Sequence, residues 1–163
     1  MKELDQMEKE WLSAFGKMTY GIYVLTTAFE DRINGMIASW VSQVSYEPPL
    51  ISVAVHPNRY SHQLIDQSRC FALHVVAKDR TDLPKRFKGP DPQAKFSDIE
   101  WSKGKTGSPI ITDCIAWFEC ELAGSLAPGN HTVFIGKVVD AKMVSENSVM
   151  STADYDGAYI GRS

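Results

Sequence analysis

Cysteine is scarce in this sequence, and the spacing of the few cysteines matches no disulfide or metal-binding pattern. Only Cys70, Cys114 and Cys120 occur among 163 residues, and no Cys-x-x-Cys pair is present. An odd count without that spacing argues against a disulfide framework and against a zinc site. The four histidines, at positions 56, 62, 74 and 131, also lack the tight spacing of metal ligands. We therefore expect no metal centre, and a reduced, cytoplasmic protein whose cysteines pack as small apolar side chains.

Long hydrophobic runs and basic tracts are absent as well. A membrane-spanning helix needs about 20 consecutive apolar residues, and no run in the chain approaches that length. The net charge is −3 and no cluster of lysine or arginine occurs, so the chain lacks the usual pattern of a nucleic-acid or anionic-membrane binder. The acidic start, Met1-Lys2-Glu3-Leu4-Asp5, has no apolar signal core. We expect neither nucleic acid nor a membrane as a partner, and no secretion.

The composition that remains is that of an ordinary globular protein, with 44% hydrophobic and 23% charged residues. A chain of 163 residues is long enough to bury one well-packed core. No internal repeat and no linker divides it. Residues 1–163 are therefore expected to form a single domain.

The pattern of apolar residues predicts a few helices and many strands. Leu4, Met7, Trp11, Phe15 and Met18 fall at helical spacing, which predicts an amphipathic first helix packed on the core. Helices are also expected at residues 61–68 and 79–87, with Pro84 inside the second, and a loop is expected at 89–107. Strands are expected at residues 21–27, 32–39, 41–45, 50–55, 71–77, 116–122, 132–139 and 155–160.

These elements predict a fold class. Strands and helices do not alternate, and no Gly-x-Gly-x-x-Gly fingerprint is present, so a doubly wound nucleotide-binding domain is disfavoured. We predict a mainly β fold, a closed antiparallel barrel with short helical insertions and an N-terminal helix.

Residues 34–50 contain small side chains that a flat ligand could lie against. Ala38 and Ser39 are small, Ser39 and Ser45 carry hydroxyls, and Trp40 can stack on a ring or wall it off. A flavin ring would suit such a ledge, because its pyrimidine edge needs hydrogen-bond partners. A plain strand with a solvent-facing serine explains the same residues, and the segment alone does not separate the two interpretations.

The segment from Asn58 to His62 contains several hydrogen-bond donors at the start of an expected helix. Ser61 is a suitable N-cap, and the first N–H groups of a helix favour a phosphate. Arg59 offers a bidentate fork for the same anion, and Tyr60 and His62 add donors. The alternative is a capped helix with an exposed arginine.

Two further residues have open roles. Lys95 in the expected loop either reaches a phosphate, covers a cofactor or is solvated surface. His131 follows Gly129-Asn130 and is either a turn residue or a donor beside a nicotinamide. His56 and His74 lie in strand contexts and are expected to be structural.

Taken together, six segments resemble the flavin reductase-like family over nearly the whole chain, from about Tyr20 to Gly161. They are Tyr20-Gly-Ile-Tyr-Val-Leu-Thr, Asn34-Gly-Met-Ile-Ala-Ser-Trp, Ser45-Tyr-Glu-Pro-Pro-Leu, Asn58-Arg-Tyr-Ser-His, Gly129-Asn-His-Thr-Val-Phe-Ile-Gly-Lys-Val and Tyr155-Asp-Gly-Ala-Tyr. In the family's flavin-contacting strand, threonine or alanine is frequent where this chain has Ile37.

The resemblance implies an FMN-binding split barrel, a homodimer with FMN near the subunit interface, and hydride transfer from NAD(P)H to FMN. Lys95 would help to hold the cofactor, and His131 would be the catalytic, nicotinamide-side residue. The other residues implied in cofactor binding are Ile37, Ala38, Ser39, Trp40 and Ser45 around the ring, and Arg59, Tyr60, Ser61 and His62 at the phosphate.

With Trp40 and Arg59-Tyr60-Ser61-His62, the chain resembles the flavoredoxin and high-molecular-weight rubredoxin branch of the family. That branch supplies electrons to rubredoxins, diiron flavoproteins or other acceptors. Three functions therefore stay open. The first is an NAD(P)H:flavin oxidoreductase, and the second is an FMN electron carrier without its own NAD(P)H turnover. The third is a related barrel that binds FMN without turning over a nicotinamide. Because no Cys-x-x-Cys pair is present to bind a rubredoxin iron, the electron acceptor is expected to be a separate protein.

Overall fold

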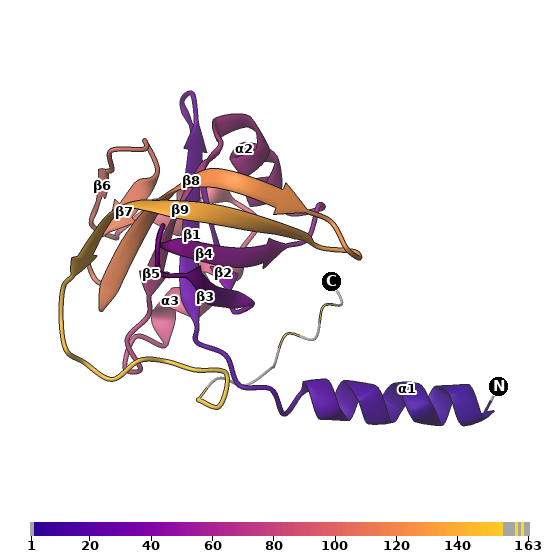
Figure 1. Ribbon diagram of the computed structural model, residues 1–163. Coiled ribbons are helices and arrows are strands. Elements are labelled where there is room, and N and C mark those ends of the chain that lie inside the picture. The colour runs from indigo at the N-terminus through magenta and orange to yellow at the C-terminus, as the bar shows by residue number, and fades with distance from the viewer. Residues whose placement is uncertain (1, 155–158, 160, 162–163) are drawn as a thin grey trace.

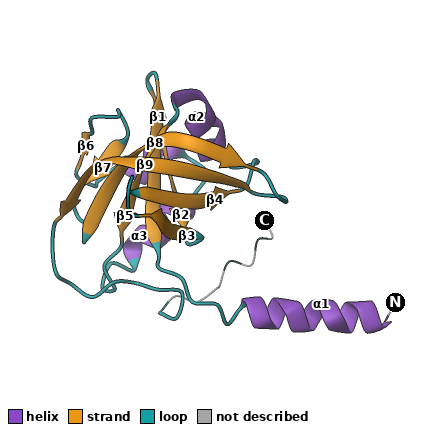
Figure 2. Cartoon of the chain, in the orientation of Figure 1, coloured by secondary structure: helices purple, strands orange, loops and turns teal. Residues whose placement is uncertain are grey.

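The computed structural model describes residues 2–154, 159 and 161, with the backbone alone described at residues 2–4. Antiparallel strands form the body, and short helices lie around it (Figure 1, Figure 2). This arrangement confirms the expected mainly β fold. The elements in chain order are α1 (Lys2–Phe15), β1 (Tyr23–Phe29), β2 (Arg32–Ala38), β3 (Val41–Ser45), β4 (Leu50–Val55), α2 (Tyr60–Ser68), β5 (Cys70–Val75), α3 (Asp82–Lys88), α4 (Pro92–Phe96), β6 (Trp101–Lys103), β7 (Pro109–Ile111), β8 (Ala116–Leu126) and β9 (Thr132–Met143).

The main sheet is antiparallel throughout and has the strand order β2-β1-β5-β8-β9-β4-β3. Its two edges are β2 and β3, so the described strands do not complete the hydrogen-bonded ring of the closed barrel that we expected. The chain bends between these strands, where the N–H of Val41 donates to the carbonyl of Ser39 at 2.9 Å. This bend turns β3 away from β2 and onto β4. One hydrogen bond, from the N–H of Ala54 to the carbonyl of Trp40 at 3.1 Å, links β4 to the bend.

Apolar side chains are buried on both faces of this sheet. Val24 and Leu25 are consecutive in β1 and therefore point to opposite faces, and both are fully buried. Leu25 packs in one cluster with Phe71 and Phe134. Val24 packs in a second cluster that lies under α3 and α4 and includes Phe87.

The second cluster explains the glycine in β2. A Cβ atom at Gly35 would lie 2.5 Å from the Phe87 ring and 3.3 Å from the Phe96 ring. These two rings contact each other in a T-shaped arrangement with centroids 5.5 Å apart. The absent side chain of Gly35 therefore makes room for core packing.

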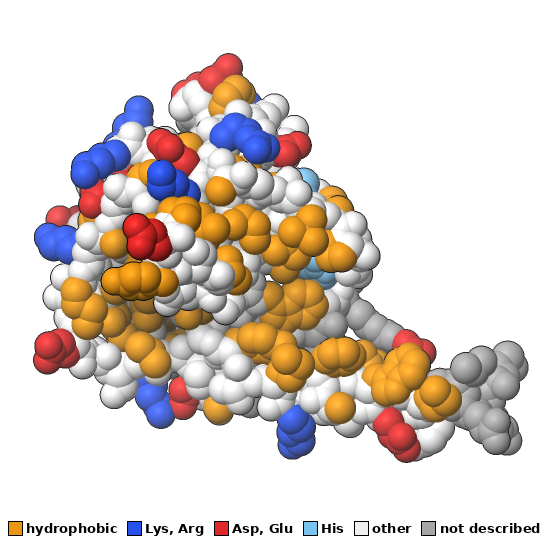
Figure 3. Space-filling model, viewed as in Figure 1, with side chains coloured by type: hydrophobic (Ala, Val, Ile, Leu, Met, Phe, Trp, Pro, Cys, Tyr) orange, Lys and Arg blue, Asp and Glu red, His pale blue; other side chains and the backbone are white. Residues whose placement is uncertain are grey.

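Helix α1 does not pack on the core as expected. It extends from the body of the molecule (Figure 1), and Met7, Trp11, Phe15 and Met18 at or just beyond it are 44 to 59% exposed. Figure 3 shows apolar side chains along one side of this helix, continuous with others on the adjoining body. The periodicity predicted the helix correctly, but it cannot tell which surface covers the apolar side. Within the described part of the chain, no helix has the length and apolar character that crossing a membrane requires.

The region expected to be a loop, residues 89–107, contains α4 and β6. The carboxylate of Asp91 caps α4 by accepting the N–H of Gln93 at 2.9 Å, and Pro92 occupies the first helical turn. Strand β6 is stabilised by pairing with β7, a contact that local sequence does not encode. Pro84 is the third residue of α3, where its missing N–H removes no intrahelical bond. The expected strand at 155–160 falls outside the described residues except for Tyr159.

Candidate functional site

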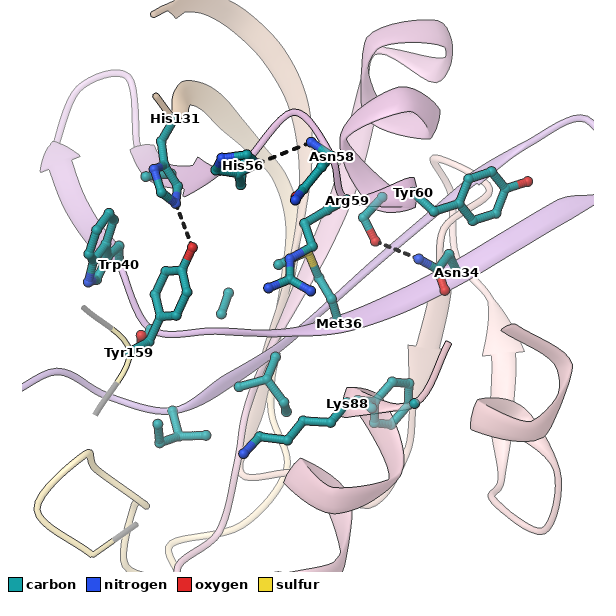
Figure 4. Close-up of a pocket in the computed structure, with 18 of the residues that line it drawn as sticks. Asn34, Met36, Trp40, His56, Asn58, Arg59, Tyr60, Lys88, His131 and Tyr159 are labelled. Atoms are coloured by element: carbon teal, nitrogen blue, oxygen red, sulfur yellow. Dashed lines mark hydrogen bonds between the residues drawn. The ribbon is translucent and has the colours of Figure 1, made fainter. Parts of the chain in front are cut away.

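A cavity of about 590 Å³ opens beside the end of β2 and the start of α2. Figure 4 shows side chains from several segments converging on it. Volumes of 300–1,000 Å³ are typical of sites for small molecules and cofactors. The described residues that line it are Ile22, Asn34, Met36, Ile37, Ala38, Ser39, Trp40, Ala54, His56, Asn58, Arg59, Tyr60, Ser61, Phe87, Lys88, Gly89, Pro90, Lys95, His131, Thr152 and Tyr159.

The expected ledge forms one wall of this cavity. Ile37 and Ala38 end β2, and Ser39 and Trp40 form the bend that follows. Ala38 and Ser39 are 5% and 7% exposed, so the wall is close-packed from behind. Because β2 is an edge strand, the side of the ledge away from β1 has no neighbouring strand among the described residues, and a flat ligand can approach the backbone there.

The start of α2 forms a second wall. Arg59 is the N-cap, and no side chain caps the helix. The N–H of His62 donates to the Arg59 carbonyl at 3.0 Å, so the N–H groups of Tyr60 and Ser61 are the ones that remain for a ligand. Ser61, which we expected at the N-cap, instead lies inside the first turn and is fully buried. Its hydroxyl oxygen accepts a hydrogen bond from Nδ2 of Asn34 at 2.9 Å. This bond turns Ser61 toward β2 and away from the N-cap position.

Lys95 belongs to the site and is not solvated surface. It lies in α4, is 6% exposed and lines the cavity. Its Nζ donates to Oδ1 of Asn34 at 3.0 Å and to the carbonyl of Gly35 at 2.9 Å. Burial and the nearby Arg59 charge lower the pKa of Lys95, and Asp91 opposes them.

Aromatic side chains form the opposite wall. The His131 ring lies between Trp40 and His56, with ring centroids 4.8 Å and 5.1 Å away, and it is 6% exposed. Its Nε2 lies 2.7 Å from the hydroxyl of Tyr159 (Figure 4). The pKa of His131 is lowered by burial first and then by His56 and Arg59. His131 is therefore part of the cavity, not an exposed turn residue.

Two of the expected site residues lie elsewhere. His62 is on the side of α2 that faces β9, where its Nε2 lies 2.8 Å from Oγ1 of Thr132 and its ring contacts Phe134. Burial lowers its pKa. Ser45 is the last residue of β3, beyond the bend that forms the ledge. The structure brings neither residue into the cavity, and we leave both out of the proposed site.

The charge of the lining residues has one sign. Arg59, Lys88 and Lys95 are cationic, and no carboxylate occurs among the described residues that line the cavity. Figure 4 shows Arg59 and Lys88 extending into the same space. Such a cavity raises the local concentration of anions and favours a negatively charged ligand.

Sequence reasoning missed several lining residues. Asn34 is the first residue of the segment that resembles the family's flavin-contacting strand, but the neighbouring sequence does not show that its side chain links α2 to α4. His56, expected to be purely structural, lines the cavity because β4 ends there. Lys88 and Tyr159 are far from the ledge in sequence. Tyr159 carried a signal through the terminal Tyr-x-x-x-Tyr segment, whereas Lys88 had none beyond its charge.

Comparison with known proteins identifies relatives of this chain. A sequence model of the flavin reductase like domain matches residues 15–161. The ferric-chelate reductase (NAD(P)H) of Archaeoglobus fulgidus is 30% identical over 151 residues, which cover 88% of each chain. The high molecular weight rubredoxin of Moorella thermoacetica is 30% identical over 149 residues, which cover 87% of this chain but only 64% of that protein.

A solved structure agrees with these matches. The NADH:FAD oxidoreductase SgcE6 of Streptomyces globisporus, determined in complex with NAD and FAD fragments, superposes with a TM-score of 0.79 at 27% identity and covers 85% of this chain and 83% of that chain. The family match spans both the ledge and the aromatic wall of the cavity. The chain therefore belongs to the flavin reductase-like family.

Proposed function

We propose that this protein is an NAD(P)H:flavin oxidoreductase that binds FMN in the cavity between β2 and α2. One observation carries the proposal. A small-residue ledge and an uncapped, cationic helix start face the same 590 Å³ space. A flat ring needs the first of these features and a phosphate needs the second.

The cationic end fits a phosphate group. The N-terminus of α2 supplies backbone N–H groups, Arg59 supplies a guanidinium fork, and Lys95 supplies an ammonium. Lys95 uses two donors on Asn34 and Gly35, so its third N–H remains for an anion. Ser61 accepts from Asn34 and keeps its own hydroxyl hydrogen for donation.

The ledge and the aromatic wall would hold the ring system and the nicotinamide. When bound, the flavin accepts a hydride from the reduced nicotinamide and passes its electrons to an acceptor. The chain's own part is to position the two rings and to exclude water. Trp40 and Met36 supply apolar surface for this purpose, and Tyr159, hydrogen-bonded to His131, supplies a hydroxyl at the edge.

A binding and reduction experiment tests the proposal. The purified protein is titrated with FMN, FAD and riboflavin, and the flavin complex is then mixed anaerobically with NADH or NADPH while its absorbance is followed. We expect FMN to bind more tightly than riboflavin, and the bound flavin to bleach with a reduced nicotinamide. A protein that binds no flavin overturns the proposal. Bleaching only by a reduced partner protein would favour the electron-carrier alternative, which the likeness to a high molecular weight rubredoxin supports.

We further propose a homodimer and a separate electron-acceptor protein, with rubredoxins and diiron flavoproteins as the first to test, in a reducing cytoplasm. The exposed apolar side of α1 supports self-association, since such a continuous patch marks an interaction surface. Free thiols at Cys70, Cys114 and Cys120 suit a reducing compartment. Oxidation of the photoreduced protein by an added rubredoxin would test the acceptor.

A further inference from the structure

Asn130, His131 and Tyr159 form a hydrogen-bonded chain at the wall of the cavity. Nδ1 of His131 lies 2.8 Å from Oδ1 of Asn130, and Nε2 lies 2.7 Å from the hydroxyl of Tyr159. The Trp40 ring, 4.8 Å from the His131 ring and 5.2 Å from the Tyr159 ring, holds both in place. A Cβ atom at Gly161 would lie 2.8 Å from the Trp40 ring, so the glycine permits this packing.

The chemistry of Asn130 fixes where the protons lie. An amide oxygen only accepts hydrogen bonds, so the His131 nitrogen that faces it must carry a hydrogen. In a neutral imidazole the other nitrogen then has a lone pair and accepts. Nε2 of His131 therefore accepts from the hydroxyl of Tyr159. With its hydrogen committed, the Tyr159 oxygen can only accept from a ligand.

We propose that Asn130 is a positioning residue: it holds His131 as the neutral form protonated at Nδ1, and thereby makes Tyr159 a pure hydrogen-bond acceptor for an N–H donor of the ligand. Within the function proposed above, on which this part rests, the matching donor is the carboxamide N–H₂ of the nicotinamide. The tautomer itself does not depend on that function.

The surroundings of His131 support the neutral form. Among the described residues, the ionisable groups that bear on it are His56, Arg59 and Tyr159, and none is a carboxylate. Burial and the positive charge of Arg59 lower the pKa of His131. A cationic His131 would have donors on both nitrogens, and the Tyr159 hydroxyl would have to turn its hydrogen away from the ring.

Replacing Asn130 with aspartate is expected to reverse the donor and acceptor roles in the His131–Tyr159 hydrogen bond, with almost no change in side-chain shape. The carboxylate would favour the imidazolium and raise the pKa of His131. Below that pKa, Nε2 would donate to Tyr159, and the Tyr159 hydroxyl would become a donor toward the ligand. The substitution thus converts an acceptor at the cavity wall into a donor without removing an atom of Tyr159.

The protonation state is measured first, on the full-length protein with ¹⁵N-labelled histidine and without any ligand. Long-range ¹H–¹⁵N spectra identify which nitrogen of each imidazole is protonated, and His131→Gln assigns the signals. We expect His131 to be protonated at Nδ1 with a pKa below the usual 6.5, and Asn130→Asp to raise that pKa by more than one unit. Asn147→Asp adds the same charge at an exposed site and should leave it unchanged. A wild-type ring protonated at Nε2, or an unmoved pKa in Asn130→Asp, overturns the proposal.

The ligand donor is measured by kinetics. The reduced 3-acetylpyridine analogue of the nicotinamide cofactor keeps the carbonyl but lacks the N–H₂ group. For each protein we take the ratio of kcat/KM for the natural cofactor to kcat/KM for the analogue. We expect this ratio to be about fivefold larger in wild type than in Tyr159→Phe. In Asn130→Asp this extra preference should vanish below the new His131 pKa and return above it. The assignment of the donor is overturned if the preference is the same in wild type and Tyr159→Phe and does not change with pH in Asn130→Asp. Absence of any flavin reduction would refute the proposed function instead and leave the spectra to decide the role of Asn130.

Discussion

Single hydrogen bonds organise the anion-binding end of the cavity. Asn34 accepts from Nζ of Lys95 and donates to Oγ of Ser61, so one amide links β2, α4 and α2. The lysine is buried with two neutral acceptors, and no carboxylate among the described residues forms an ion pair with it. A buried charge that is solvated but not neutralised gains most from a bound anion. This arrangement makes the site ready for a phosphate before any ligand arrives.

The contribution of Arg59 is the first prediction at this scale. Arg59→Ala removes a guanidinium from the start of α2, and a hydrogen bond to a charged group is worth about 1.5–3 kcal/mol. We expect the FMN dissociation constant to rise roughly 10- to 100-fold, while riboflavin, which lacks the phosphate, should bind almost as before. Fluorescence titration measures both. Lys137→Ala removes a charge from an exposed position in β9 and is the control. An FMN dissociation constant that matches this control would exclude Arg59 from the site.

Elements were predictable where local pattern and packing agree. The strands from Tyr23 to Val55 appear where the sequence predicted them. Strand β4 gives the simplest reason, since its alternate residues Ile51, Val53 and Val55 are buried. The tertiary contacts that select among local options were not predictable. Ser61 looked like an N-cap, but its bond to Asn34 draws it inside α2. The sequence left the place of Lys95 open between a cofactor site and the surface, and the packing of α4 on β2 decides it by burying the lysine against Asn34. The ledge and Arg59 were identified from sequence, whereas His56 and Lys88 needed the fold.

Helix α1 carries the prediction at the scale of elements. Its apolar side chains are exposed in one chain, and covering them by a second copy would bury the aromatic rings of Trp11 and Phe15. We expect wild type to be a dimer in light-scattering chromatography, and Trp11→Ser/Phe15→Ser to shift it toward monomer without loss of the β signal in circular dichroism. Lys9→Ala changes the polar side of the same helix and should remain dimeric. A monomeric wild type would refute the homodimer.

At the scale of the whole molecule, His74 joins the main sheet to the two-stranded sheet. Its Nδ1 donates to the carbonyl of Val24 at 3.0 Å, because a carbonyl only accepts. Its Nε2 then accepts the N–H of Ile111 at 3.0 Å. The ring therefore bridges β1 and β7 from its position in β5, and it must be neutral to do so. The expectation that His74 is structural agrees with this placement.

The neutral state of His74 predicts how stability depends on pH. Burial lowers its pKa from 6.5 to about 4, so between these values the unfolded chain binds a proton that the folded protein does not. The free energy of unfolding should be independent of this group above pH 6.5 and fall by about 3 kcal/mol as pH drops to 4. Urea unfolding at several pH values measures it. His74→Gln should be less stable at pH 7 but lose most of that slope, whereas His56→Gln should keep it. An unchanged slope in His74→Gln would show that other groups control the acid sensitivity of the fold.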